Sequence, residues 1–542
     1  RHESSRARRN YGCAYMQIAF RLVRQAMDLK GRGIGLLAPT IAHSLGPQFM
    51  RESFMQIGRQ LGASDQAAGL ALARAMESYR AFEVRRGEHA RETLASLDAG
   101  KKTFVLVSKI YGVADQALHM GIPGRLMDMG YAVIPFAYLP KTDIFAQHPN
   151  MYWPFGQHIL EAARLVKRHP GLYAIFLTHH GCGPDTVLSH YFREIMGEKP
   201  YLAVEVDEHA SNVGVATRVE AFVRSLERTA PRSDGRIGAV DVPDEPTPPL
   251  VARLSLLAPE TTVYLPHMPP YADLIRERLA AEGRDARLLR PTSRASVDMG
   301  RRHTVTNEYY SMAALLGDVL ASLGQNGAAG GKRAVVVPQN EGAEVDGQYA
   351  RFLRAKLDAA GLGDVAVVSP FLEDLAEATD ADVRMLFLCL LFGDVVLAAP
   401  RTDRARVLAQ ATRLLREGRE SAETLAALAR SVRHDVPSGN GSKTLFALGE
   451  PLVLYNDALC DDTLGRLEDA GHRVLRAPLA ECLWLLWSDH LEAAKPDGAA
   501  CLCRRLDDLA ALIAMVSGSL GECSPYAPDL ASLRRAADAA IG

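Results

Sequence analysis

The sequence predicts an α/β protein with tandem Rossmann-like domains, each built on a doubly wound, mostly parallel sheet and joined by helical connections. Two short apolar runs, residues 173–177 and 201–206, have the length and composition of buried parallel strands. Each run ends in a polar turn that leads into a helical pattern. The same alternation of strand, turn and helix begins at residues 103–108, which is the second observation that favours this fold class.

The 542 residues are enough for three or four domains of ordinary size. Residues 1–100 carry amphipathic and helix-rich patterns, with a short strand predicted at 33–38. After them we expect a first Rossmann-like domain at 101–228 and a linker rich in Pro, Gly and Asp at 229–250. A second Rossmann-like domain with a helical extension is expected at 251–440. A third α/β domain is expected at 441–542, and we expect the end of the chain to cut it short. The similar spacing of the first two domains indicates a duplicated architecture.

Charge is nearly balanced, with 62 basic and 64 acidic residues, so composition indicates neither nucleic acid nor an anionic membrane as a partner. Small organic ligands are expected instead.

The longest apolar run, near residues 385–399, is too short to span a bilayer and is predicted to be a buried helix. Eight scattered cysteines do not form a disulfide framework, which favours a cytoplasmic location. No apolar core follows the basic start of the chain, so we expect no export signal and a chain that begins inside a longer polypeptide.

The turn HHGCGPD follows the first of the two apolar runs and contains a thiol between two glycines, Gly181 and Gly183. Glycines let the backbone approach a bulky ligand, and backbone N–H groups can donate to sulfur. Because ligands bind at the carboxyl ends of parallel strands, we expect Cys182 to face a ligand. Asp185 and Thr186 are predicted to cap the next helix, whose positive end would lower the pKa of Cys182. These features predict a metal or cluster ligand.

The turn after the second run, DEHASN, concentrates acidic, basic and capping groups. Glu208 suits a capping network, whereas Asp207 either supports the site or caps a helix. His179 and His180 are either core or capping histidines or contact a ligand. A mononuclear metal site formed by Cys182, one of these histidines and Asp207 is therefore one interpretation.

The two turns, HGCGPD and VDEHASNVGVATRVEAF, resemble the signature of the 2-hydroxyacyl-CoA dehydratase-type family, in particular the dehydratase-like half of acyl-CoA dehydratase activase-related fusion proteins. The resemblance extends from about Cys13 to the end and is most specific in these turns. It implies Rossmann-like strands whose ends hold a 4Fe-4S iron–sulfur cluster through cysteines, and a lyase or reductase activity on an acyl-CoA. It also implies an ATP-hydrolysing activase domain or subunit as the electron source. For residues 1–100, it implies the end of an upstream α/β domain followed by a helical bridge.

By this resemblance, Cys13 and Cys182 occupy positions of cluster ligands. The family's two further cysteines would lie in turns of the second domain that here contain Tyr309, beside Glu308, and Glu344. Because neither turn contains a thiol, two hypotheses stay open. In the first hypothesis, Cys13 and Cys182 bind a cluster, and the missing ligands are oxygen or histidine side chains, such as Glu344, or come from a partner chain. In the second hypothesis, the chain has lost the cluster and kept the scaffold.

Three functions follow from these alternatives. The first is a component of an ATP-activated, iron–sulfur-dependent acyl-CoA dehydratase or reductase system, which transfers a low-potential electron to an acyl-CoA or similar small substrate. The second is a non-catalytic scaffold or regulatory region of a fusion protein, and the third is the mononuclear metal site at Cys182. The sequence contains no Walker-type phosphate loop, so ATP hydrolysis would belong to a separate activase domain or chain. Association with a second copy or with another chain is left open.

Overall fold

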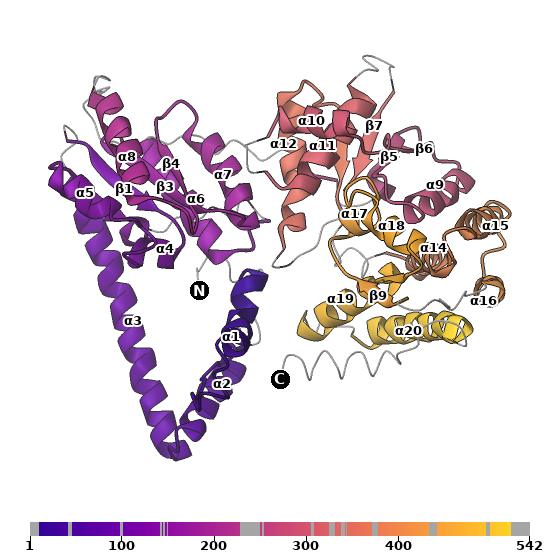
Figure 1. Ribbon diagram of the computed structural model, residues 1–542, viewed down its shortest axis with the longest axis horizontal. Coiled ribbons are helices and arrows are strands. Elements are labelled where there is room, and N and C mark those ends of the chain that lie inside the picture. The colour runs from indigo at the N-terminus through magenta and orange to yellow at the C-terminus, as the bar shows by residue number, and fades with distance from the viewer. Residues whose placement is uncertain are drawn as a thin grey trace. The chain divides into compact units, whose positions relative to one another are not determined.

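The computed structural model describes residues 10–41, 46–97, 101–140, 144, 147–148, 150–227, 250–251, 254–304, 308–324, 331–337, 342, 344–370, 378–432, 442–494 and 499–521. The chain divides into two compact units, one formed by Arg1–Thr247 with Glu341–Gln348 and the other by Pro248–Asn340 with Tyr349–Gly542. Within the described residues, each unit contains a four-stranded parallel sheet with helices around it (Figure 1). The predicted α/β fold class is therefore confirmed, whereas the predicted linker at 229–250 lies almost wholly outside the described residues.

The sheet of the first unit is formed by β1 (Thr103–Val107), β2 (Ala132–Pro135), β3 (Leu172–His179) and β4 (Leu202–Val206), all parallel and in the order β2-β1-β3-β4. The helices that follow these strands are α4 (Ile110–Ala114), α5 (Ile122–Asp128), η3 (Phe136–Tyr138), α6 (Pro154–Arg168), α7 (Gly183–Met196) and α8 (Asn212–Glu227). Side chains of α5 and α8 share one apolar core with β1, β3 and β4, whereas α6 packs against α7 and against β1 and β3. All five residues of β1 are buried, as expected for the central strand of a covered parallel sheet.

The order of the strands reverses between β1 and β3. From β1 the chain crosses to β2 on one side, and from β3 it crosses to β4 on the other side. The loops after β1 and β3 therefore lead in opposite directions across the sheet, and proteins of this architecture bind ligands at the carboxyl ends of two such strands. The turn that contains Cys182 lies at this point, between β3 and α7.

Three helices precede the first sheet: α1 (Ala14–Ala26), α2 (Gly46–Gln60) and α3 (Asp65–Ala95). The hydroxyl of Ser64 accepts a hydrogen bond from the N–H of Ala67 and so caps α3, which pairs with α2 in a helical hairpin (Figure 1). Near its other end, α3 joins the sheet domain through Arg86, which donates to the carbonyl of Ala137 at 2.8 Å. The strand predicted at 33–38 is wrong: this segment is irregular and no described strand pairs with it.

The sheet of the second unit is formed by β5 (Thr262–Leu265), β6 (Ala286–Leu288), β7 (Arg333–Val336) and β8 (Ala366–Val368), in the order β6-β5-β7-β8. The short and longer helices along this stretch are η4 (Leu254–Leu256), α9 (Tyr271–Ala281), α10 (Arg294–Arg301), α11 (Tyr310–Leu323), η5 (Val345–Gln348, which belongs to the first unit) and α12 (Tyr349–Ala359). The order matches that of the first sheet strand for strand, which agrees with the predicted duplication. Gly300 and Gly317 allow α10 and α11 to approach closely, because a Cβ at Gly317 would lie 1.8 Å from the carbonyl oxygen of Ser296.

The rest of the second unit is mainly helical and contains α14 (Asp380–Ala398), α15 (Arg404–Arg416), α16 (Ala422–Ser431), α17 (Pro451–Leu454), α18 (Thr463–Asp469), α19 (Leu479–Ala494) and α20 (Ala499–Gly521), with a two-stranded parallel sheet of β9 (Thr444–Ala447) and β10 (Arg473–Arg476). The run near 385–399 forms α14 from its second turn to its C-terminal end and is largely buried among α9, α15, α16, α19 and α20, so the predicted buried helix is confirmed. Among the described helices, none is long and apolar enough to cross a membrane.

Candidate functional site

A cluster of polar side chains occupies the carboxyl ends of β1 and β3 in the first unit. Lys109 lies two residues after the end of β1, while His179 is the last residue of β3 and Cys182 directly precedes α7. These two strands are the ones between which the strand order reverses, so the cluster lies where α/β proteins of this type bind ligands.

The turn from β3 into α7 depends on one glycine and on the cysteine. Gly181 has a φ of 66°, a left-handed conformation that other residues rarely adopt. Cys182 is the N-cap of α7: its Sγ accepts a hydrogen bond from the N–H of Asp185 at 3.5 Å. The prediction that Asp185 and Thr186 cap this helix is therefore wrong, since the thiol takes that position. The carboxylate of Asp185 is left to make other contacts.

Lys109 holds an ammonium group inside this cluster. Its Nζ lies 2.6 Å from Oδ2 of Asp185 and donates to Sγ of Cys182 at 3.1 Å. Both charged side chains are almost fully buried, with 5% of Lys109 and 3% of Asp185 exposed. The rings of Phe155 and Tyr111 have their centroids 5.8 and 6.0 Å from Nζ, within reach of cation–π attraction. The ammonium is therefore fixed by one carboxylate, one sulfur and two aromatic rings.

His179 shares the carboxylate of Asp185. Its backbone N–H donates to Oδ2 at 2.9 Å, and its Nδ1 lies 3.1 Å from the same oxygen. The imidazole packs beside the ring of Tyr111, with centroids 5.5 Å apart. Gly112 is required for this arrangement, because a Cβ there would lie 2.5 Å from the hydroxyl of Ser108 and 3.2 Å from the imidazole. The other ring nitrogen of His179, Nε2, is buried and has no hydrogen-bond partner among the described residues.

The charges of the cluster shift the pKa of its members. Burial by itself raises the pKa of Asp185, but the hydrogen bonds from His179 and the charge of Lys109 outweigh it and hold the pKa below its usual range. For Lys109, burial lowers the pKa, yet Asp185 and Cys182 raise it above the ordinary lysine value. Burial and the charge of Asp185 raise the pKa of Cys182. The lowering expected from the end of α7 is therefore wrong, because desolvation and the nearby carboxylate dominate.

The other polar residues singled out in the two turns lie outside this cluster. His180 is 67% exposed and its Nδ1 lies 2.6 Å from Glu205, on β4. Asp207 accepts a hydrogen bond from the backbone N–H of His209 at 3.0 Å, and Glu208 is exposed beside that histidine. None of these contacts includes Cys182. The structure brings together His179 and Cys182 but does not add His180 or Asp207 to them.

Cys13 and Glu344 are also placed apart from the cluster contacts. Cys13 is the N-cap residue of α1, half-buried, and its side chain makes no capping hydrogen bond. Glu344 is exposed. In the second unit, Tyr309 is the N-cap residue of α11 and its ring lies beside that of Tyr349. Across the described residues, no group of three or more His, Cys, Asp or Glu side chains is arranged to hold a metal ion.

These contacts test the donor set that an iron–sulfur cluster needs. A 4Fe-4S cluster is held by several thiolates, whereas the described contacts of this rim involve one thiol, a carboxylate, an imidazole and an ammonium. An ammonium 3.1 Å from the sulfur also competes with a metal ion for the same lone pairs. The described residues therefore do not by themselves fit an iron–sulfur cluster. That a partner chain supplies the missing cluster ligands stays a prediction.

Sequence reasoning missed Lys109, the residue on which the cluster depends. It also assigned Asp185 to a helix cap instead of to an ion pair. A lysine two residues after the end of a buried strand, at the point where the strand order reverses, is the feature that could have identified it.

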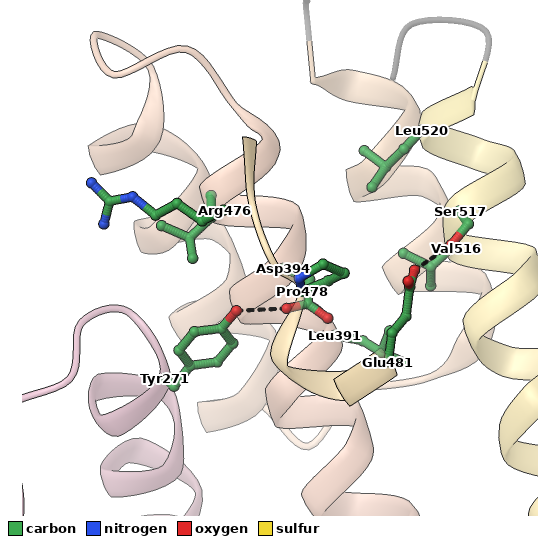
Figure 2. Close-up of a pocket in the computed structure, with 10 residues that line it drawn as sticks. Tyr271, Leu391, Asp394, Arg476, Pro478, Glu481, Val516, Ser517 and Leu520 are labelled. Atoms are coloured by element: carbon green, nitrogen blue, oxygen red, sulfur yellow. Dashed lines mark hydrogen bonds between the residues drawn. The ribbon is translucent and has the colours of Figure 1, made fainter. Parts of the chain in front are cut away.

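A small cavity in the second unit has a different character (Figure 2). Its volume of about 20 Å³ has room for roughly one water molecule. Asp394 lines it and accepts hydrogen bonds from the hydroxyl of Tyr271 at 2.6 Å and from the N–H of Leu479 at 2.9 Å. The carboxylate of Asp394 thereby caps α19 from α14. Glu481 lines the same cavity and accepts from the hydroxyl of Ser517 at 3.2 Å.

Both carboxyl groups of this cavity titrate near neutral pH. Burial is the main cause, and it raises the pKa of Asp394 and of Glu481 to about 7 each. The cavity is too small for an acyl-CoA. We therefore interpret it as a buried polar cluster that fixes α19 and α20 against α14.

Comparison with known proteins gives one match. A family model described as the CoA enzyme activase uncharacterised domain matches residues 1–139. This stretch holds α1 to α3, β1 and β2, and it includes Lys109 and Tyr111. No curated protein and no solved structure matches the chain. The match supports a relation to an acyl-CoA activase system at a coarse level, while the specific resemblance to 2-hydroxyacyl-CoA dehydratases stays a prediction.

Proposed function

We propose that the chain is the substrate-binding component of an activase-dependent acyl-CoA dehydratase or reductase system. One observation carries the proposal: the buried ammonium of Lys109 contacts Cys182 and Asp185 where the strand order of the first sheet reverses. The match to a CoA enzyme activase domain includes Lys109 and supports an acyl-CoA as the substrate class. ATP hydrolysis would take place in a separate activase domain or chain.

The cluster contains groups suited to a thioester. The ammonium of Lys109 has three N–H donors, of which Asp185 and Cys182 accept two. The hydroxyl of Tyr111 also interacts with this ammonium, so a ligand carbonyl oxygen would take the place of that hydroxyl as the third acceptor. With Nδ1–H of His179 donating to Asp185, Nε2 is the nitrogen that can accept a proton. A carbonyl-polarising cation near an imidazole suits acid–base chemistry on a thioester, because loss of water from a hydroxyacyl group requires a group that accepts a C–H proton and a cation that stabilises negative charge on the carbonyl oxygen.

Calorimetric titration of the purified chain with a short-chain acyl-CoA tests this proposal. We expect Lys109→Met and His179→Ala each to weaken binding at least about tenfold, because each removes a polar contact to the ligand. The matched control is His180→Ala, because His180 is the neighbouring histidine but is exposed and contacts Glu205. This control is expected to change affinity by less than about twofold. Equal affinity in all four proteins, or no binding by the wild type, would contradict the proposal.

A non-catalytic scaffold is the second candidate function, and Ser311 favours it. This residue lies in the first turn of α11, two residues after Tyr309, which stands where the resembling family has a cysteine. The hydroxyl of Ser311 is hydrogen-bonded to Tyr349 at 2.7 Å and to Glu450 at 2.8 Å, so the start of α11 is packed internally.

Anaerobic reconstitution with iron and sulfide separates the two candidates. An iron–sulfur-dependent enzyme is expected to retain iron with an EPR signal, and Cys182→Ala to lose it. A scaffold is expected to retain none in either protein. One zinc per chain without sulfide would favour the mononuclear site.

A further inference from the structure

Tyr111 lies over the ammonium of Lys109 and separates it from solvent. The ring centroid of Tyr111 is 6.0 Å from Nζ of Lys109 and 5.5 Å from the centroid of the His179 imidazole. The hydroxyl of Tyr111 also interacts with the ammonium. Because the side chain of Lys109 is only 5% exposed while Tyr111 is 38% exposed, the tyrosine forms the outer boundary of the cluster on its side.

The other neighbours of this ammonium are held in longer helices. Asp185 lies in α7 and is almost fully buried, Cys182 is the half-buried N-cap residue of the same helix, and Phe155 is half-buried in α6. These two helices pack against each other, and α6 also packs against the sheet. A ligand therefore reaches Nζ most readily by displacing Tyr111.

Tyr111 belongs to α4, which is short. Of its five residues only Gly112 is buried, and its N-cap residue makes no capping hydrogen bond through its side chain. A helix of this length has little stability of its own, because few of its backbone groups are paired within it. Gly112 lets α4 approach His179, since a Cβ there would lie 3.2 Å from the imidazole. The segment that carries Tyr111 thus fits closely over the cluster, yet a single buried residue holds it there.

We propose that Tyr111 is a self-inhibitory cover of the candidate site, which holds the place of the ligand's carbonyl oxygen on Lys109 until the ligand displaces it. This inference rests on the proposed function, because the displacing group is the thioester carbonyl of an acyl-CoA. It adds that the site is closed at rest and that the hydroxyl of Tyr111 lowers the affinity for the ligand. A ligand without a carbonyl oxygen gains no hydrogen bond by moving this hydroxyl, so the cover also favours thioesters.

Calorimetric titration with butyryl-CoA and with S-butyl-CoA, a thioether analogue that lacks the carbonyl oxygen, tests the cover. Tyr111→Phe is expected to bind butyryl-CoA at least about threefold more tightly than the wild type, because it keeps the ring and removes the competing hydroxyl. Its affinity for S-butyl-CoA is expected to stay within about twofold of the wild type. The matched control is Tyr138→Phe, since Tyr138 is 41% exposed and its ring lies beside His89 instead.

The direction of the change separates this role from a structural one, because a tyrosine that only supports the site would weaken binding when it is altered. If Tyr111→Phe binds butyryl-CoA as tightly as the wild type or less tightly, the cover is wrong and the proposed function stands. An equal gain for both ligands would also overturn the cover, since the hydroxyl would then not compete with a carbonyl.

The proposed function fails in a different way. If none of these proteins binds butyryl-CoA, the acyl-CoA site itself is wrong, and the cover falls with it. Far-UV circular dichroism and urea unfolding of each variant establish that the chain still folds, so that a loss of binding is not mistaken for a loss of structure.

Discussion

Lys109 Nζ lies 2.6 Å from Oδ2 of Asp185, and this ion pair joins the end of β1 to the first turn of α7. Both side chains are almost fully buried, so solvent does little to screen the attraction or to replace a lost partner. A buried charge without its partner is costly, which makes each of these two charges dependent on the other.

Asp185→Asn is expected to destabilise the first unit by about 3 to 5 kcal/mol, because the variant leaves a buried ammonium without a counter-ion. Urea unfolding followed by far-UV circular dichroism measures the change. The matched control is Glu220→Gln, which breaks the more exposed pair between Arg125 and Glu220 and is expected to cost far less stability, because solvent screens that pair. Similar losses of unfolding free energy in the two variants would show that the ion pair of Lys109 and Asp185 is not shielded from solvent as the structure indicates.

Cys182 is expected to react with iodoacetamide more slowly at neutral pH than a free cysteine, because burial and Asp185 raise its pKa. Mass spectrometry of the peptide that contains Cys182, over a pH series, gives the midpoint of the rate. Lys109→Met is expected to move this midpoint upward, since the charge of Lys109 lowers the pKa of the thiol. A midpoint below that of a free cysteine would instead support the thiolate that the sequence predicts.

Glu481→Gln is expected to flatten the dependence of stability on pH. The pKa of Glu481 is about 7 in the folded chain and 4.5 as its ordinary value, so the folded state binds the proton more tightly. Stability therefore falls as pH rises from about 4.5 to about 7, by on the order of 3 kcal/mol for this group. Urea unfolding at pH 5.5 and pH 8 measures the slope, with Glu77→Gln on the exposed side of α3 as the control. An unchanged slope would mean that Glu481 is not desolvated.

Gly317→Ala is expected to destabilise the second unit by about 1 to 3 kcal/mol, because the new Cβ would collide with the backbone of Ser296 and force α10 and α11 apart. Gly214→Ala is the matched control: it lies in α8 and a Cβ there meets nothing within 4 Å. This control is expected to stabilise by up to about 1 kcal/mol, since alanine is the better helix former. Thermal unfolding compares the two, and equal effects would contradict the close helix contact.

Local patterns were sufficient to predict the layers of the fold. The apolar runs at 103–108, 173–177 and 201–206 correspond to β1, β3 and β4. The central strands β1 and β3 are largely apolar because most of their residues are buried, whereas β4 at the edge of the sheet is only partly buried. The segment at 33–38 has a similar composition but no neighbouring strand among the described residues, so its backbone stays irregular. A β-strand forms only beside another strand that pairs with its backbone, and the composition of one segment does not show whether such a strand is present.

The candidate site was predicted only in part, for a related reason. Cys182 and its two glycines are adjacent in sequence, so their turn is visible there. Lys109 is 73 residues away, and its contact with Cys182 depends on the pairing of β1 with β3. The two histidines are also indistinguishable in sequence, yet Asp185 binds His179 while Glu205 binds His180.

The strand order β2-β1-β3-β4 of the first unit recurs as β6-β5-β7-β8 in the second. A framework present twice has two equivalent positions for reactive groups, one at the carboxyl ends of each pair of central strands. In this chain the ammonium, thiol and imidazole gather on the first copy. The repetition therefore allows a division of labour: one sheet can bear the reactive groups while its counterpart, with the same strand order, contributes scaffold.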